Sequence, residues 1–148
     1  MPQAKRKLED AKVPVRIRLA LLWASLMSLY IYNDYFSLYR PGTIADMSAG
    51  RMGPLGPATP AVMIAVSLLL AVPALMIFLS SVLPPGPCRW LNVVLGFAYT
   101  AIEGLTITRA VPSYQIVVAL EIALTLAIVW HAFRWPRIES AQPETPAA

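Results

Sequence analysis

Three carboxylic acids, Asp34, Glu103 and Glu121, lie inside long apolar segments of this 148-residue chain. Ionisable groups within a membrane are costly, and the default interpretation of such a residue is a functional site. Three carboxylates that lie close together at low dielectric cannot all stay ionised, so at least one would hold a proton or exchange it for a cation. The chemistry that these residues suggest is binding of a proton, a cation or a small polar molecule.

The three acids share one depth in the predicted membrane. At about 1.5 Å per helical residue, Asp34, Glu103 and Glu121 lie roughly 8, 10 and 12 Å from the outer ends of their segments. Polar side chains accompany each acid at helical spacing, namely Tyr30 and Asn33 with Asp34, Tyr99 and Thr106 with Glu103, and Thr125 with Glu121. Because a polar stripe on an apolar helix should face protein, these eight residues are expected to line an outward-facing acidic pocket.

A structural interpretation of the same residues stays open. In that interpretation the acids are protonated or paired and hold the helices together by hydrogen bonds, which average about 0.6 kcal/mol between membrane helices. The sequence does not choose between a binding pocket and such a clamp.

Four apolar segments must position the acids. They cover about 19–39, 60–82, 90–110 and 113–135, and each is near the ~20 residues that a membrane-spanning helix needs. Their apolar runs are continuous, which is typical of helices and not of barrel strands. Residues 1–18 form a basic segment before this 19–135 transmembrane domain, and residues 136–148 are expected to be a disordered tail.

The connections predict the arrangement of the helices. The Gly- and Pro-rich segment 41–59 predicts a loop, and Pro84, Pro85 and Pro87 predict a tight turn. Short turns make neighbouring helices antiparallel, so the expected fold is an all-α, integral-membrane four-helix bundle with up-down-up-down order. Small residues at fourfold spacing, which let a neighbouring helix approach closely, are Gly96, Thr100, Gly104 and Thr108.

Composition and charge narrow the class of protein. The chain is 57% hydrophobic and 14% charged, whereas soluble domains are about 25% charged, so a soluble domain is excluded. One Cys and one His leave no ligand set for zinc or haem, and no metal or cofactor is expected. No Ser/His/Asp or Cys/His arrangement is available on one side of the membrane, so no catalytic residue is assigned and an enzyme is not favoured.

The basic residues indicate orientation. The net charge is +4, and nine of the 12 Lys and Arg residues lie on the side of the chain ends. The positive-inside rule places both termini in the cytoplasm. Since these charges flank the spans, they report topology, and nucleic-acid binding is not expected.

Several residues together resemble a known family. They are Leu22, Trp23, Met27, Tyr30, Asp34, Tyr39, Pro41 and Gly42 in the first segment, Pro73 in the second, Arg89, Trp90, Leu91, Asn92 and Gly96 in the third, and Tyr114, Glu121, Thr125, Ile128, Val129, Trp130 and Trp135 in the fourth. Over about 20–135 the chain resembles an uncharacterised bacterial family of small four-span membrane proteins, a domain of unknown function. The resemblance implies a protein of the bacterial cytoplasmic (inner) membrane and supplies no activity.

Two functions therefore stay open. One is a small membrane protein that binds or transports a proton, cation or small polar molecule through the acidic pocket. The alternative is a non-catalytic structural, regulatory or lipid-interacting membrane subunit. The expected partners are the lipid bilayer and either a second copy of the chain, as a homodimer, or a larger membrane complex.

Overall fold

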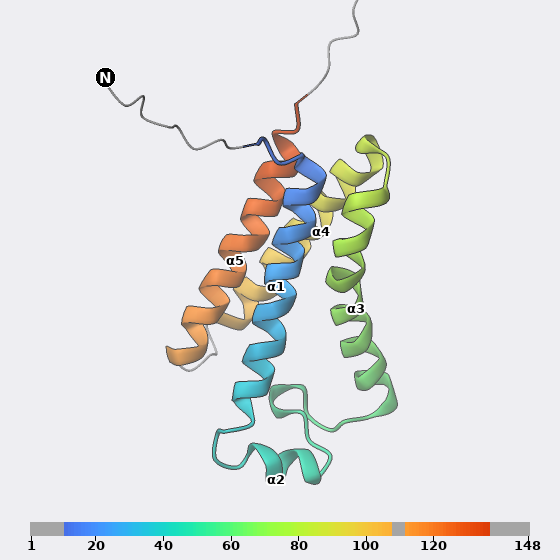
Figure 1. Cartoon of the computed structure of the whole chain (residues 1–148). Coiled ribbons are helices and arrows are strands. Elements are labelled where there is room, and N and C mark those ends of the chain that lie inside the picture. Colours follow the sequence, from blue (N-terminus) through green and yellow to red (C-terminus); the bar gives the residue numbers. More distant parts are fainter. Residues whose placement is uncertain (1–10, 108–111, 137–148) are drawn as a thin grey trace, which may run out of the picture.

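The chain folds into a bundle of four long helices. The structure, a computed structural model, describes residues 11–107 and 112–136. Its helices are α1 (Val15–Ser37), α2 (Thr43–Ser48), α3 (Pro60–Val82), α4 (Pro85–Ile107) and α5 (Pro112–Phe133), with a 3-10 turn, η1, at Gly53–Leu55. Four of them, α1, α3, α4 and α5, are long and apolar enough to cross a membrane. The fold is an all-α, integral-membrane four-helix bundle, in which α1 starts and α5 ends at the same end (Figure 1).

The packing order differs from the order along the chain. Helix α4 packs against α5, and α1 packs against both α3 and α5, whereas α3 and α4 contact each other little. The connection between α3 and α4 is short, yet the two helices are not close neighbours along their length. Figure 1 shows α3 on the side of α1 that faces away from α5.

Two helices begin four or five residues earlier than the apolar segments predicted. Helix α1 starts at Val15 instead of residue 19, and α4 starts at Pro85 instead of residue 90. The expected proline turn is therefore partly wrong, because Pro85 and Pro87 form the first turn of α4. Proline suits this position, since the first N–H groups of a helix have no intrahelical acceptor and proline already has the helical φ angle. The segment 41–59 is also not all loop, since it contains α2 and η1.

A proline inside α3 creates a bond between helices. Pro73 lies within the helix, and a proline has no N–H to donate to the carbonyl four residues earlier. That carbonyl belongs to Leu69, and the Tyr99 hydroxyl of α4 donates to it at 2.5 Å. An unpaired carbonyl is costly in lipid, so Tyr99 stabilises the interrupted helix and joins α3 to α4.

A cluster of buried polar side chains joins three helices in the half of the bundle near the chain ends. The fully buried Trp23 of α1 donates its indole N–H to Asn92 Oδ1 of α4 at 2.7 Å. The Asn92 amide donates to the Cys88 carbonyl at 2.8 Å, and its Nδ2 lies 3.3 Å from Ser80 Oγ of α3. The cluster joins α1, α3 and α4. Hydropathy did not single out these residues, because Trp and Cys count as apolar and Asn92 is an isolated polar residue.

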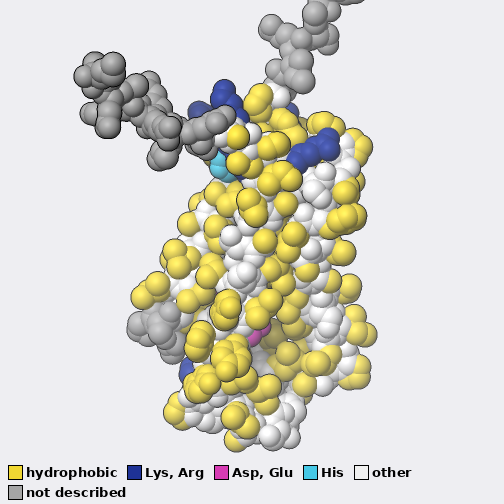
Figure 2. All heavy atoms as spheres, in the orientation of Figure 1, with side chains coloured by type: hydrophobic (Ala, Val, Ile, Leu, Met, Phe, Trp, Pro, Cys, Tyr) yellow, Lys and Arg dark blue, Asp and Glu magenta, His cyan; other side chains and the backbone are white. Residues whose placement is uncertain are grey.

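The basic side chains lie mostly at one end of the molecule. Figure 2 shows most Lys and Arg side-chain atoms at the end where α1 begins and α5 finishes, and a largely apolar flank below. At that end Arg89 Nη2 donates to the Phe133 carbonyl at 3.2 Å, which satisfies a carbonyl at the C-terminus of α5.

Candidate functional site

Glu103 lies at the centre of the outer half of the bundle, the half away from the chain ends. Its side chain is 4% exposed. The Tyr30 hydroxyl of α1 donates to Glu103 Oε1 at 2.6 Å, and the Thr125 hydroxyl of α5 donates to Glu103 Oε2 at 3.0 Å. One carboxyl group on α4 therefore contacts two other helices, and each of its oxygens accepts a hydrogen bond.

A close approach of α4 and α5 makes the bond between Thr125 and Glu103 geometrically feasible. Thr100 Oγ1 lies 2.8 Å from Thr125 Oγ1 across the α4–α5 interface. One turn away, Gly96 is buried, and a Cβ atom on it would lie 2.7 Å from Val129 Cγ2. Only a glycine lets α5 pack this closely at that point. The close approach brings the Thr125 hydroxyl within hydrogen-bond distance of Glu103.

Glu121 is the second buried acid. It is 3% exposed, and its Oε1 atom is buried without a hydrogen-bond partner among the residues that the structure describes. Its carboxyl group lies within electrostatic range of Glu103 and Asp34. A polar group buried in an apolar medium without a partner is strongly destabilising, and a charged one more so. Glu121 Oε1 is thus a buried acceptor atom that the described protein groups leave unsatisfied.

Asp34 occupies a different environment at the outer end of α1. It is exposed and lines a cavity of about 600 Å³ between α1 and the α2–η1 segment. Arg51 and Asp46, which line the same cavity, form an ion pair with each other. Figure 2 shows acidic side-chain atoms inside a hollow beside α1 in this part of the molecule. Asp34 therefore lines this cavity, named here the outer cavity, and also interacts electrostatically with the buried Glu121.

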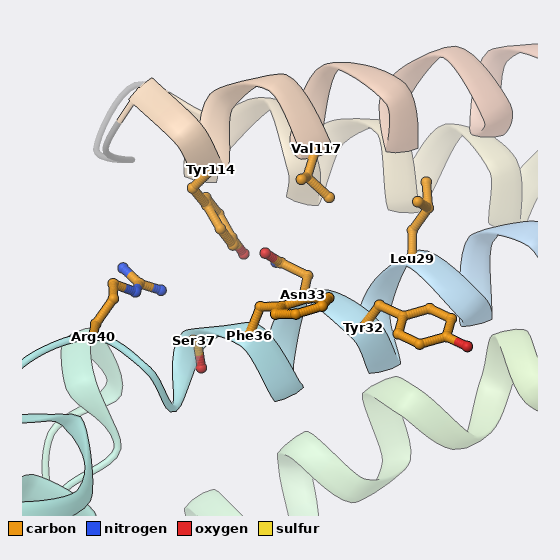
Figure 3. Close-up of a pocket in the computed structure, with 8 residues that line it drawn as sticks. All are labelled: Leu29, Tyr32, Asn33, Phe36, Ser37, Arg40, Tyr114 and Val117. Atoms are coloured by element: carbon orange, nitrogen blue, oxygen red, sulfur yellow. The ribbon is translucent and has the colours of Figure 1, made fainter.

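The other residues predicted for the pocket are dispersed. Asn33 faces Tyr114 in a separate cavity between α1 and α5 (Figure 3). Tyr99 is 4% exposed and bonds to α3 instead of to an acid. Thr106 is exposed, and its hydroxyl donates to the backbone carbonyl of Glu103 at 2.8 Å. The structure therefore brings Tyr30, Glu103, Glu121 and Thr125 together, and it directs Asn33, Tyr99 and Thr106 elsewhere.

The expected stripe of small residues is divided in the same way. Gly96 and Thr100 lie at the α4–α5 interface. Gly104 is exposed, with nothing within 4 Å of the position that a Cβ atom would take, and Thr108 lies outside the described residues. The reason is helix geometry, because fourfold spacing advances about 40° around a helix at each step, and Gly104 is therefore turned about 80° from Gly96.

Thr100 makes a contact that the sequence analysis did not predict. Thr100 was expected only as a small packing residue, yet its hydroxyl reaches Thr125. Arg40 lies over the Tyr114 ring, with 6.0 Å between the guanidinium carbon and the ring centroid. Within residues 11–107 and 112–136, no three His, Cys, Asp or Glu side chains gather into a metal-binding group.

Comparison with known proteins identifies the family. A family model described as "Family of unknown function (DUF6326)" matches residues 9–142. The chain belongs to the DUF6326 family. The match includes all four long helices of this DUF6326 protein and all three intramembrane acids. No curated protein and no solved structure matches the chain.

Proposed function

We propose that this DUF6326 protein is a small membrane protein that binds a proton, or a small cation in its place, at the Glu103–Glu121 pair. The observation that carries the proposal is the buried Glu121 Oε1 atom, which has no partner among the described residues. Glu103 accepts two hydrogen bonds, as an ionised carboxylate does. A second negative charge beside it in low dielectric is unfavourable, so the pair favours one bound positive charge.

Access from the outer side supports exchange of the bound ion. Asp34 lines the outer cavity of about 600 Å³ and lies within electrostatic range of Glu121. An exposed carboxylate that interacts electrostatically with a buried acid attracts cations toward that acid and can exchange a proton with it. Exchange with the outer solution is the minimal activity. Transport through the membrane would need a second opening, for which a homodimer or a larger complex is our proposal.

The same proposal includes the setting of the protein. The concentration of Lys and Arg at the end with the termini (Figure 2) favours cytoplasmic termini under the positive-inside rule. We place the protein as a multi-pass protein of a bacterial cytoplasmic (inner) membrane, with the lipid bilayer as its constant partner.

An infrared pH titration tests ion binding. The full chain in lipid nanodiscs should show a carbonyl band from a protonated carboxyl group that disappears as the pH rises. Glu121→Gln should remove or strongly shift that band. Asp46→Asn is the matched control, because Asp46 is a carboxyl group of the outer segment that pairs with Arg51, and it should leave the band unchanged.

Replacement of the proton by a cation is tested with the same samples. At constant pH, Na⁺ or K⁺ should decrease the band if the cation replaces the proton, and choline should not. An unchanged wild-type band in Glu121→Gln would contradict the proposal, since the protonated group would then lie elsewhere.

One observation favours the alternative of a structural subunit. Glu103 is bonded to α1 and α5 simultaneously, which is the geometry of an interhelical clamp. In that function the pair would bind no exchangeable ion, and neither pH nor cations would change the infrared band within the stable range of the protein.

A further inference from the structure

We propose that the groove between α1 and α5 is a binding site for one outer-leaflet phospholipid, whose phosphate contacts Arg40 and one of whose acyl chains lies along the groove. This proposal does not depend on ion binding at Glu121. It rests on two cavities that follow each other along the same pair of helices and on the change of their chemistry with depth.

The cavity nearer the outer end of α1, which we name the upper cavity, offers polar and charged groups for a phosphate. It has a volume of about 260 Å³ and includes Asn33, Ser37, Arg40 and Tyr114 in its lining. Figure 3 shows the Arg40 guanidinium at the outer end and the Asn33 and Tyr114 side chains pointing toward one another across the space. Within the described part of the chain Arg40 forms no ion pair. Its charge therefore remains available for an anion, three residues beyond the end of the spanning helix α1, where we expect the phosphates of the outer leaflet.

The other residues that line the upper cavity are mostly apolar. Leu29, Tyr32, Phe36 and Val117 complete the lining of the upper cavity, and Tyr32 and Phe36 are 63% and 62% exposed. Aromatic rings at the membrane interface, with apolar side chains beneath them, match the transition from headgroup to hydrocarbon in a lipid.

The groove continues deeper into the membrane. A second cavity, of about 460 Å³, shares Leu29 with the first and is lined further by Ser25, Ser28, Leu120, Ala123 and Leu124. The two serine hydroxyls donate to carbonyls of their own helix, at Leu21 and Ala24, each at 2.9 Å. These serines therefore act as small, internally satisfied side chains, and they leave a channel that suits hydrocarbon.

The length of the groove fits an acyl chain. From Ser37 to Ser25 the helix rises about 18 Å, and half of a bilayer hydrocarbon core is about 15 Å. The residues from α5 follow in the opposite direction, from Tyr114 through Val117 and Leu120 to Leu124. A single amphiphile with its anionic group outward therefore matches the groove in length, polarity and charge.

Binding of phosphatidylglycerol to the delipidated full chain in detergent tests the proposal. Native mass spectrometry counts the bound lipids, and thermal unfolding measures affinity. We expect one tightly bound lipid, and we expect Arg40→Gln to weaken its binding by about tenfold, as for loss of a charge-assisted hydrogen bond. Arg51→Gln is the control, because Arg51 is paired with Asp46 on the same side.

A second pair of variants tests the acyl groove. Ala123→Phe should fill the lower cavity and reduce lipid retention, whereas Ala98→Phe should not. Ala98 is an exposed alanine of α4, and it lies as far from the described end of its helix as Ala123 lies from Tyr114. Equal effects of the two variants would overturn the assignment of the groove, as would wild-type lipid affinity in Arg40→Gln.

Two probes separate lipid from other ligands of similar chemistry. Diacylglycerol with the same acyl chains lacks the phosphate and should bind more weakly. Glycerophosphoglycerol is water-soluble and lacks the acyl chains, so it should give no thermal shift. A shift from glycerophosphoglycerol equal to that from the lipid would refute a lipid site in favour of a soluble phosphoester site.

Discussion

Replacing Gly96 by alanine should separate α4 from α5. The added Cβ atom would lie 2.7 Å from Val129 Cγ2 and 3.3 Å from the Thr125 carbonyl oxygen. Neither neighbour can yield easily. Val129 is only 9% exposed, β-branched side chains have few alternative rotamers, and the second neighbour is backbone.

The magnitude follows from two opposing effects. Overpacking of a well-packed interface costs about 1–3 kcal/mol, and alanine in place of glycine stabilises a helix by about 0.5–1 kcal/mol. We therefore expect Gly96→Ala to lower the free energy of unfolding by about 1–2 kcal/mol. The displacement should also weaken the Thr125 bond to Glu103, because Thr125 belongs to the same helix turn that must move.

Gly104→Ala is the matched control on the same helix. Nothing lies within 4 Å of its would-be Cβ atom, so the variant should be as stable as the wild type or slightly more stable. Unfolding in mixed micelles of increasing dodecyl sulfate content, followed by circular dichroism, compares the three proteins. If Gly96→Ala matched Gly104→Ala in stability, the close α4–α5 approach would be refuted.

Two further predictions concern single hydroxyl groups. Tyr99→Phe should destabilise the bundle by about 1 kcal/mol by leaving the Leu69 carbonyl unpaired. The loss should shrink when Pro73→Ala restores an N–H donor to that carbonyl, and a double-mutant cycle measures the difference; equal losses in both backgrounds would argue against this role. Tyr30→Phe removes a 2.6 Å bond to Glu103, and it should cost about 1 kcal/mol and shift the carboxyl infrared bands. An unchanged spectrum would contradict the Tyr30–Glu103 contact.

The sequence by itself determined the class of protein and its membrane helices. Apolar runs of about 20 residues need hydrogen-bonded helices to cross a bilayer, and this requirement acts on each segment separately. The segment 60–82 accordingly has the bounds of α3. The presence of Asp34, Glu103 and Glu121 within the spans could be seen for the same reason, because a charged residue inside an apolar run needs no neighbour to be noticed.

The tertiary structure decided which helix faces meet. In lipid, an apolar face gains little by preferring a helix over an acyl chain, so hydropathy does not choose the neighbours. Only the assembled bundle shows that α1 packs between α3 and α5 and that Gly96, unlike Gly104, contacts a helix.

The same limit applied to the site. Helical spacing grouped Tyr99 with Glu103, but the carbonyl exposed by Pro73 on another helix takes the Tyr99 hydroxyl. Glu103 is paired and Glu121 Oε1 is left without a partner among the described residues. That distinction depends on distances of a few ångströms between side chains of different helices, and periodicity along one helix contains no information about them.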